Sequence, residues 1–338
     1  MPSDNIARFA AKLGRLPRLS LTRLPTPLEP LKRLSAHLGG PNIWVKREDC
    51  TGFGFGGNKL RKLDYLLTEI GDADTLVSGG VVQSNSSRQV AAAAAKLGLG
   101  CHLAVYHGRL TPPGPAYETS GNVALNRLFG ATLHDVPWTG DRNQAIGELA
   151  SQLTEQGRKP YVVPYGVSNG LGAAGYASTA LEIAQQADAN SFTPTAIVHC
   201  SGSGATQAGL AIGAAACLPN CRVVGIDIDA EPERVRADVI RYAEAAAAYL
   251  DEHFDAACID VIAGHAGPAY GIPHQVTIDA IMLMGRLEAL ALDPVYSGKG
   301  LAGLIALIAD KRWGHGDNVV FVHTGGAPAL FAYPALSC

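Results

Sequence analysis

One lysine stands where its amine could act as a nucleophile. The segment GFGFGGNKLRKLDYLL places Asn58 and Lys59 after a glycine-rich turn, at the start of a predicted helix. Unpaired backbone N–H groups and the positive end of the helix dipole disfavour an ammonium group there, so a desolvated lysine is easier to deprotonate. A neutral amine is both a nucleophile and a base. The same residues also fit an ordinary turn and helix start with a solvated lysine, and other loops must decide between these interpretations.

A second glycine-rich loop has the composition of a phosphate-binding cup. In CSGSGATQAG, Gly202 and Gly204 stand among hydroxyl residues between a predicted strand and a predicted helix. Bare N–H groups in such a loop bind one phosphate. Gln207 occupies the position where a dinucleotide fingerprint needs glycine, and no Walker-type Lys-Ser/Thr pair follows. The loop therefore predicts a monophosphate site, to which Lys62 could add charge; a tight turn that needs glycine for close packing is the alternative.

Polar residues also follow an earlier predicted strand. Gln83, Ser84 and Asn85 come after the β-branched run Thr75–Val77 and precede an alanine-rich helix. Ligands of open α/β sheets bind at such carboxyl ends of strands. Ser84 or Asn85 would equally serve as the N-cap of the helix, so this loop alone favours neither role.

Two further loops near the C-terminus contain hydroxyl groups. DPVYSGKG supplies Tyr296 and Ser297, and VHTGGAPALF supplies Thr324 before two glycines. Hydroxyl groups and glycines thus gather again at predicted strand ends. A buried tyrosine with a satisfied hydroxyl and a threonine in a turn are the purely structural interpretations of Tyr296 and Thr324.

The elements that would carry these loops alternate between strand and helix. Helical patterns follow the strands at 86–97, which ends before Gly98, and at 205–216. This alternation predicts an α/β fold with parallel sheets and crossover helices on both faces. The alanine-rich stretch 244–249 is interpreted as a surface helix. Short β-branched runs bounded by glycine predict strands at Ile43–Val45, Thr75–Val77, His102–Val105, Tyr161–Val163, Ala196–His199, Val223–Ile228 and Val319–Val322.

The composition favours a compact protein that acts on a small molecule. The chain has 338 residues, of which 47% are hydrophobic, and a formal net charge of −3. It can bury a large core, and it lacks the basic field expected of a partner for nucleic acid or anionic lipid. Its seven cysteines lack paired CxxC spacing, which favours reduced thiols and no metal site. Basic residues interrupt the apolar runs of residues 1–20, so no signal peptide and no membrane span is expected, and a cytoplasmic location is predicted.

Eight motifs taken together resemble one enzyme family. From about residue 20 to the C-terminus, the chain resembles the family that contains D-cysteine desulfhydrase and 1-aminocyclopropane-1-carboxylate deaminase. The resemblance implies the tryptophan-synthase β-type fold of pyridoxal-phosphate enzymes, fold type II, with two open twisted parallel-sheet domains, the cofactor in the cleft, and a homodimer. It implies a large cofactor-binding domain of residues 1–59 and 171–338 and a small domain of residues 60–170. The motifs are TPLEPL, KREDC, GGNKLRKLDYL, QSNSSRQ, SGSGATQAGL, PAYGIP, DPVYSGKGLAGL and HTGGAPALF.

The resemblance also assigns roles to individual residues. It implies that Lys59 holds pyridoxal 5'-phosphate as a Schiff base, and that Tyr296 and Tyr270 are active-site tyrosines. Thr324 would face the pyridine nitrogen, and Ser84 would hold the substrate carboxylate or move protons. The implied catalytic residues are Lys59, Ser84, Tyr296 and Tyr270; the implied cofactor-binding residues are Lys59, Asn58, Lys62, Asn85, Gly202, Ser203, Gly204, Ala205, Thr206 and Thr324; the implied substrate-binding residues are Ser84, Asn85, Gln83 and Tyr296.

Two positions favour the elimination of a thiolate. A neutral hydroxyl at Thr324 cannot hold the pyridine nitrogen protonated, and an unprotonated pyridine favours loss of a good leaving group from Cβ over a long-lived carbanion. The deaminase branch of the family has glutamate in place of Ser297 and leucine in place of Thr324. The resemblance therefore implies that a small amino acid, D-cysteine, is converted to pyruvate, sulfide and ammonia, with Lys59 removing the α-proton. The handedness of the substrate is inherited from the family.

Other activities stay open at this point. Ser86 and His274 depart from the family pattern in segments expected to line the substrate pocket, so an L-cysteate sulfo-lyase or a 1-aminocyclopropane-1-carboxylate deaminase is an alternative. A binding protein without catalytic activity would have lost Lys59 or the proton-transfer hydroxyls, and these are present. A nicotinamide dehydrogenase would need a glycine spacing that neither glycine-rich loop has.

Overall fold

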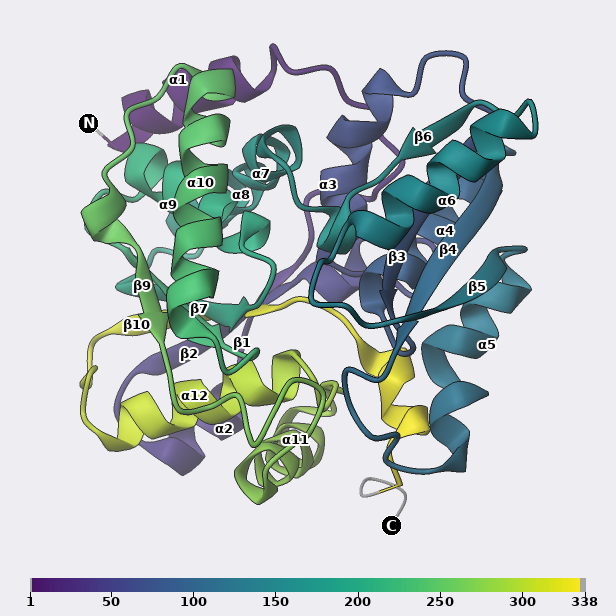
Figure 1. Ribbon diagram of the computed structural model, residues 1–338. Coiled ribbons are helices and arrows are strands. Elements are labelled where there is room, and N and C mark those ends of the chain that lie inside the picture. Colours follow the sequence, from purple (N-terminus) through teal and green to yellow (C-terminus); the bar gives the residue numbers. More distant parts are fainter. Residues whose placement is uncertain (1, 335–338) are drawn as a thin grey trace.

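Two sheets, each covered by helices on both faces, make up the structure (Figure 1). This computed structural model describes residues 2–334. The strand order is β1-β2-β10-β7-β8-β9 in the six-stranded sheet and β5-β4-β3-β6 in the four-stranded sheet. All neighbouring strands are parallel except β1 and β2. The strands are β1 (Leu28–Pro30), β2 (Asn42–Arg47), β3 (Thr75–Val81), β4 (Gly100–His107), β5 (Thr132–Pro137), β6 (Pro160–Val162), β7 (Ala196–Ser201), β8 (Arg222–Asp227), β9 (Asp260–Ile262) and β10 (Asn318–His323). The helices are α1 (Pro2–Leu13), α2 (Lys32–Leu38), α3 (Asn58–Leu66), α4 (Asn85–Leu97), α5 (Gly121–Leu128), α6 (Gln144–Glu155), α7 (Gly170–Tyr176), α8 (Ser178–Ala189), α9 (Ala205–Cys217), α10 (Pro232–Leu250), α11 (Gln275–Glu288) and α12 (Ser297–Ala309).

The predicted strands are confirmed, and the strands that the pattern misses lie at sheet edges. Each predicted run overlaps β2, β3, β4, β6, β7, β8 or β10. The sequence pattern does not indicate β1, β5 or β9. β1 and β9 have three residues each, and β5 carries Asp135 and Pro137, residues that are depleted in strands. The antiparallel pairing of β1 with β2 also departs from the parallel arrangement that the sequence predicts.

Side chains of the central strands alternate between two apolar layers. In the four-stranded sheet, Leu76 and Leu103 pack with α3 and α4, whereas Val77 and Ala104 pack with α6 on the opposite face. In the six-stranded sheet, α2, α11 and α12 cover one face and α8 and α9 the other, with α1 and α10 outside them (Figure 1). Burial on both faces explains why these strands are near-continuous hydrophobic runs in the sequence. The division into domains at residues 60 and 170 remains a prediction; the four-stranded sheet lies within residues 75–162.

The predicted helices are present, with one correction. Gly98 ends α4 in the left-handed conformation, with φ of 72°. The stretch 244–249 lies within α10, as predicted, but it is not wholly a surface segment. Ala246 and Ala247 are buried in the cluster that α10 forms with α7 and α9, while Tyr249 is exposed. Because alanine carries little information about burial, its pattern does not distinguish the two faces of this helix.

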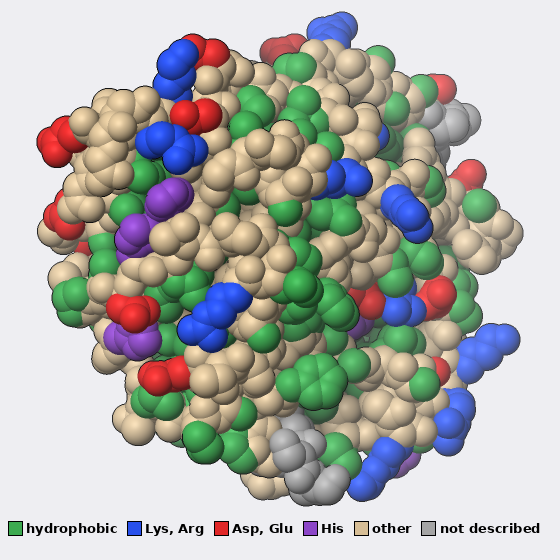
Figure 2. Space-filling view, turned by 90° about the vertical axis from the view of Figure 1, so that its right-hand side faces the viewer, with side chains coloured by type: hydrophobic (Ala, Val, Ile, Leu, Met, Phe, Trp, Pro, Cys, Tyr) green, Lys and Arg blue, Asp and Glu red, His purple; other side chains and the backbone are tan. Residues whose placement is uncertain are grey.

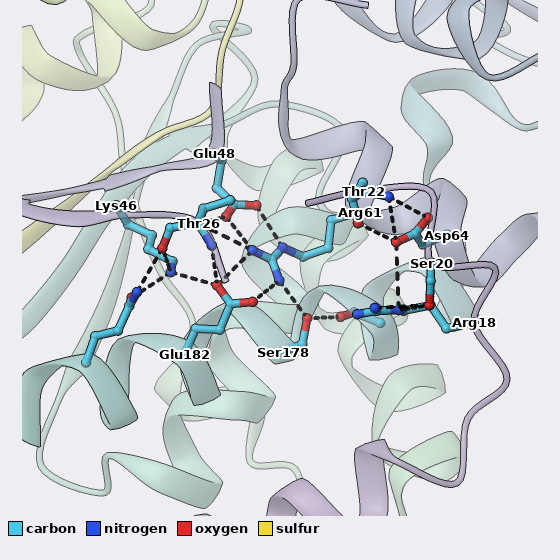
Figure 3. Close-up of polar contacts among 12 residues, drawn as sticks. Arg18, Ser20, Thr22, Thr26, Lys46, Glu48, Arg61, Asp64, Ser178 and Glu182 are labelled. Carbon is cyan, nitrogen blue, oxygen red and sulfur yellow. Dashed lines mark hydrogen bonds and ion pairs between the residues drawn. The ribbon is translucent and has the colours of Figure 1, made fainter. Parts of the chain in front are cut away.

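A buried network of charges anchors α3, the helix that carries Lys59 (Figure 3). The Arg61 guanidinium donates to Glu48, after β2, with Nη2–Oε1 at 2.6 Å, and to Glu182, in α8, with Nη1–Oε1 at 2.7 Å. Lys46 of β2 also binds Glu182, at 2.7 Å. The network therefore ties the start of α3 to the six-stranded sheet and to α8.

Three further features concern the predictions made from composition: the apolar length of the helices, the state of the cysteines and the distribution of basic side chains. Among residues 2–334, no helix is both long and apolar enough to cross a bilayer. The six cysteines of the described chain are free thiols, and Cys338 lies outside the described residues. On the face that Figure 2 shows, Lys and Arg side chains are dispersed among polar and hydrophobic ones rather than gathered in one area.

Candidate active site

Lys59 lies where two cavities meet. The first, here called the cup cavity, is lined by Asn58, Lys59, Cys200, Ser201, Gly202, Ser203, Gly204, Thr206 and Tyr296. The second, here called the arginine cavity, is lined by Lys59, Ser86, Arg109, Arg142, Tyr165, Gly166, Gly202, Ser203, Ile228, Asp229, Tyr270 and Tyr296. Lys59 is half-buried and lines both cavities, and desolvation is the largest influence on the pKa of its amine. The interpretation of Lys59 as a solvated turn residue is therefore wrong.

The surroundings of Lys59 favour a neutral amine. Burial lowers the pKa of Lys59 below its ordinary value, and Cys200 and Asp293 offset this effect only in part. Lys59 is the second residue of α3, so the helix terminus acts in the same direction. A lysine with a lowered pKa is a nucleophile and a base at neutral pH.

The turn before Lys59 needs glycine for reasons of space. Gly56 and Gly57 have φ of 62° and 126°, and a Cβ on Gly56 would lie 1.8 Å from the carbonyl oxygen of Asp49. Thr51 closes the turn, because its hydroxyl bonds both the N–H group and the carbonyl oxygen of Gly57. The glycines of GFGFGG thus let the chain fold tightly before α3.

The cup cavity has the features of a phosphate site. Gly204, with φ of 89°, directly precedes α9, and a Cβ there would lie 3.0 Å from Asp238. The first N–H groups of α9 have no partners within the helix, and its dipole favours an anion. Asn58 Oδ1 and Ser201 Oγ are buried and have no hydrogen-bond partner within the protein. Buried polar atoms rarely stay unpaired, so the cavity fits a polar ligand that carries a phosphate.

The structure brings most of the predicted cofactor residues together, but Lys62 does not join them. Gly202, Ser203 and Thr206 line the cup cavity, and Ala205 begins α9 directly behind them. Lys62 lines neither cavity: it is buried and donates to the carbonyl oxygen of Gly166 at 2.9 Å. Its predicted charge contact with the phosphate is therefore not seen, and burial lowers its pKa well below the ordinary value.

Thr324 lies behind the cup cavity, beside a residue that the sequence analysis did not select. Its hydroxyl is 3.2 Å from the Sγ atom of Cys200, which lines that cavity, and its carbonyl oxygen accepts from the N–H group of Asn58 at 3.1 Å. Thr324 therefore connects β10 with both the start of α3 and the end of β7. Cys200 directly follows the predicted strand Ala196–His199 and precedes the glycines of the loop, which is the signal that could have identified it.

At the start of α4, one serine caps the helix and another lines the arginine cavity. Ser84 is the N-cap: its Oγ atom accepts from the N–H group of Ser87 at 3.1 Å and lies 2.9 Å from the Oγ atom of Ser86. Ser86 lines the cavity, whereas Ser84 does not. Ser84 thus occupies the N–H group of Ser87, and the N–H groups of Asn85 and Ser86 before it are the ones left at this helix start for a carboxylate.

Gln83 and Asn85 hold α5 against α4. Gln83 Nε2 donates to the carbonyl oxygen of Tyr117 at 2.6 Å, and its Oε1 accepts from the N–H group of Asn122 at 2.9 Å. Asn85 Oδ1 accepts from Asn122 Nδ2 at 2.8 Å. Neither side chain lines a cavity, so a direct contact of either with substrate or cofactor remains a prediction.

Two tyrosines face Lys59. The hydroxyl groups of Tyr270 and Tyr296 form a hydrogen bond with each other, and the Nζ atom of Lys59 lies 5.2 Å from the centre of the Tyr296 ring. Burial raises the pKa of both phenols well above the ordinary value, so both carry their protons at neutral pH. The pair can therefore donate and accept hydrogen bonds beside the amine of Lys59.

Four polar side chains of the arginine cavity, those of Arg109, Arg142, Tyr165 and Asp229, were not predicted. Arg109 and Arg142 come from loops beside β4 and α6, and Asp229 follows β8. Asp229 Oδ1 lies 2.6 Å from Arg109, Asp229 Oδ2 lies 2.6 Å from Arg142, and the hydroxyl of Tyr165 accepts from Arg109 at 3.2 Å. The position of Arg109 and Asp229 just beyond strand ends is the signal that could have found them.

Comparison with known proteins decides the family. The family described as pyridoxal-phosphate dependent enzymes matches residues 19–325. The chain belongs to this family. It is 43% identical over 324 residues to a D-cysteine desulfhydrase of Yersinia enterocolitica, covering 95% of this chain and 97% of the relative. A D-cysteine desulfhydrase of Serratia proteamaculans is likewise 43% identical, over 326 residues.

Solved structures agree with this membership. A crystal structure described as an ACC deaminase homologue superposes with a TM-score of 0.87 at 31% identity and covers 98% of both chains. The processed form of threonine deaminase isoform 2 from Solanum lycopersicum gives a TM-score of 0.66 at 19% identity over 96% of this chain and 85% of its own, which shows the shared fold. The chain is thus a pyridoxal-phosphate-dependent enzyme with the type II fold, and pyridoxal phosphate is its cofactor.

Proposed function

We propose that this enzyme is a D-cysteine desulfhydrase, which converts D-cysteine and one water molecule into pyruvate, sulfide and ammonia. The observation that carries the proposal is the 43% identity to D-cysteine desulfhydrases over 95% of the chain. Ser297 and Thr324, the two positions that separate the desulfhydrase branch from the deaminase branch, support the same choice. In the reaction the Cα–H and Cβ–S bonds break, sulfide leaves, and water finally replaces nitrogen at Cα.

The cup cavity suits the cofactor. Gly202, Ser203 and Thr206 with the start of α9 would hold the phosphate, and Asn58 would contact the ring. The unpaired Ser201 Oγ and Asn58 Oδ1 would then gain partners. When bound, pyridoxal phosphate supplies the electron sink for the pair released from the Cα–H bond.

Lys59 and the tyrosine pair would handle the protons. Lys59 would hold the cofactor, and its neutral amine would accept the α-proton of the substrate. The N–H groups at the start of α4, beside Ser86, bind the substrate carboxylate and so orient the Cα–H bond. Tyr296 and Tyr270, protonated and hydrogen-bonded, donate to the departing sulfur or hold the substrate near the amine. Enclosure of the cavities excludes bulk water from these steps.

Cysteate is a second candidate substrate. Two guanidinium groups, of Arg109 and Arg142, line the same cavity as Lys59, and one carboxylate, of Asp229, lies between them. Such a wall suits a substrate whose β-substituent is an anion, such as a sulfonate that leaves as sulfite. Ser86, where the sequence departs from the family pattern, lines this cavity as well. This departure is a second reason to test cysteate beside D-cysteine.

The proposal also covers the compartment, the oligomeric state and the partners of the enzyme. We propose that it acts in the cytoplasm on a small amino acid, as a homodimer, without nucleic acid or membrane as a partner. The net charge of −3 and the dispersed basic side chains on the face in Figure 2 support the part of this proposal that leaves out nucleic acid and anionic membranes. Size-exclusion chromatography with light scattering measures the oligomeric state directly.

Product release by the purified, cofactor-loaded protein tests the proposal. Sulfide and pyruvate are measured from D-cysteine, with L-cysteine and L-cysteate in parallel and sulfite measured for the last. Equal sulfide and pyruvate, chiefly from D-cysteine, support the desulfhydrase. Faster sulfite release from L-cysteate would replace it with the second candidate. No turnover of any of the three would contradict both.

A further inference from the structure

An ion pair in the arginine cavity joins loops of the two sheets. Arg109 stands in the loop after β4 of the four-stranded sheet, and Asp229 follows β8 of the six-stranded sheet. Their side chains are 10% and 3% exposed, and Arg109 Nη2 lies 2.6 Å from Asp229 Oδ1. A pair this enclosed is screened far less by solvent than a surface pair.

Arg109 is also packed between aromatic rings of both sheets. Its Cζ atom lies 4.0 Å from the centre of the Tyr270 ring and 4.7 Å from the centre of the Trp138 ring. Its Nη1 group donates to the hydroxyl of Tyr165 at 3.2 Å. Charge, stacking and hydrogen bonding therefore fix the guanidinium plane in one orientation.

The contact with Tyr270 connects this ion pair to the reacting groups. Tyr270 shares a hydrogen bond with Tyr296, and the Tyr296 ring lies 5.2 Å from the amine of Lys59. Tyr270 lies in a turn that the bridge between Ala269 and Ile272 closes, and its ring meets the Tyr296 ring edge to face, with 6.0 Å between the ring centres. Arg109 is the cation that packs on that ring.

We propose that Arg109 is a positioning residue, which joins the two sheets through Asp229 and holds the Tyr270–Tyr296 pair in place beside Lys59. The proposal deepens the proposed function and rests on it, because the tyrosine pair is taken to act on the substrate. Arg142 shares Asp229 but stacks on Tyr165 instead, at 5.4 Å. Loss of Arg142 would remove one cation from Asp229 but would leave the contact between Arg109 and the Tyr270 ring.

Turnover of D-cysteine tests the positioning role. Because a displacement of about 1 Å costs about 100-fold in rate, we expect Arg109→Gln to lower kcat by about 100-fold with a much smaller change in KM. Arg109→Lys keeps the charge but not the planar stack, so it should recover part of the loss. The matched control is Arg312→Gln, since Arg312 pairs with Asp260 and its Cζ atom lies 5.6 Å from the centre of the Trp313 ring, and none of these three residues lines the arginine cavity. It should keep the wild-type kcat.

A double-mutant cycle shows whether Arg109 acts through Tyr270. Tyr270→Phe keeps the ring for stacking but removes the hydroxyl that bonds Tyr296. If Arg109 works by placing that hydroxyl, Arg109→Gln should cost less than about threefold in kcat in the Tyr270→Phe background, because the effects of coupled residues do not add. The full 100-fold loss in that background would overturn the proposal.

Tryptophan emission gives a readout that does not depend on turnover. Trp138 packs on Arg109, so Arg109→Gln should shift its emission, and the shift should disappear in a Trp138→Phe background. Unchanged emission together with a kcat within twofold of wild type would overturn the proposal. If wild-type protein releases no sulfide from D-cysteine, the proposed function fails, whereas the shift still reports whether Arg109 is held in its place against Trp138.

Discussion

Replacement of Arg61 by methionine should destabilise this enzyme strongly, because it leaves buried carboxylates without their cation. Arg61 is fully buried, and its guanidinium binds both oxygens of Glu48, at 2.6 Å and 2.9 Å, and both oxygens of Glu182, at 2.7 Å and 3.1 Å (Figure 3). Methionine fills much of the volume of the arginine stem without a charge. The change therefore removes the charge contacts rather than opening a large cavity.

The magnitude follows from what remains around each carboxylate. Glu182 keeps Lys46 at 2.7 Å, whereas Glu48 keeps only the hydroxyl of Thr26, also at 2.7 Å. Removal of one partner of a buried ion pair costs about 3–5 kcal/mol of unfolding free energy. Because a buried carboxylate without its cation is protonated more readily, the loss should be smaller at pH 5 than at pH 8. A second change, Glu48→Gln, removes the stranded charge and should recover part of the loss.

Urea unfolding followed by circular dichroism measures this difference, provided that the slope m is unchanged. Lys159→Ala is the control: Lys159 pairs with Asp72 at 2.6 Å on the surface, and the urea midpoint should not shift. A loss below about 1 kcal/mol for Arg61→Met would refute the reasoning, because it would mean that the network contributes no more than an exposed pair. Equal loss in the Glu48→Gln double variant would refute the assignment to the stranded carboxylate.

Three further predictions concern the site and its pH dependence. Lys59→Ala should abolish sulfide release and the long-wavelength absorbance of the bound cofactor, with an unchanged circular dichroism spectrum; retained turnover would contradict its role. With Ser297 and Thr324 in place, release of 2-oxobutanoate from 1-aminocyclopropane-1-carboxylate should be slow or absent, and rapid release would reverse the choice of branch. Burial lowers the pKa of His199 to about 4 from an ordinary 6.5, so its neutral form stabilises the fold above pH 6.5, and roughly 3 kcal/mol of that stability is lost as the pH falls from 6.5 to 4. His199→Gln should flatten the pH dependence of unfolding in this window, and an unchanged slope would argue against the buried neutral histidine.

The sequence predicts the centre of the fold better than its edges, for a physical reason. Runs such as Ile43–Val45 and Ala196–His199 are buried on both faces, so nearly every side chain has to be apolar and the signal is strong. An edge strand is held by one neighbour and by few apolar contacts, so β5, with Asp135 and Pro137, has a composition close to that of a loop. The backbone pairing that makes it a strand comes from β4, which a local pattern cannot reveal.

The site divides in the same way, into residues fixed by local chain geometry and residues fixed by packing. Lys59 and the glycines around Ser203 could be predicted, because a tight turn before a helix leaves a signature within a few residues. Arg109 and Asp229 are 120 residues apart, and only the meeting of two sheets makes them neighbours. Arginines and aspartates beyond strand ends are common, so residue type alone does not select these two.

Lys62 shows the opposite error, in which residue type and spacing suggest a contact that packing prevents. It lies three positions after Lys59 on α3, close enough for its charge to be assigned to the phosphate. Burial on that face directs its amine to the carbonyl oxygen of Gly166, and a Cβ on Gly166 would lie only 2.6 Å from the Oγ atom of Ser203. Lys62 therefore holds Gly166 in place, and Gly166 packs against Ser203 of the cup cavity. The direction of a side chain, which the fold sets and the motif does not, decides whether a charge near a site acts on the ligand or on the protein that surrounds it.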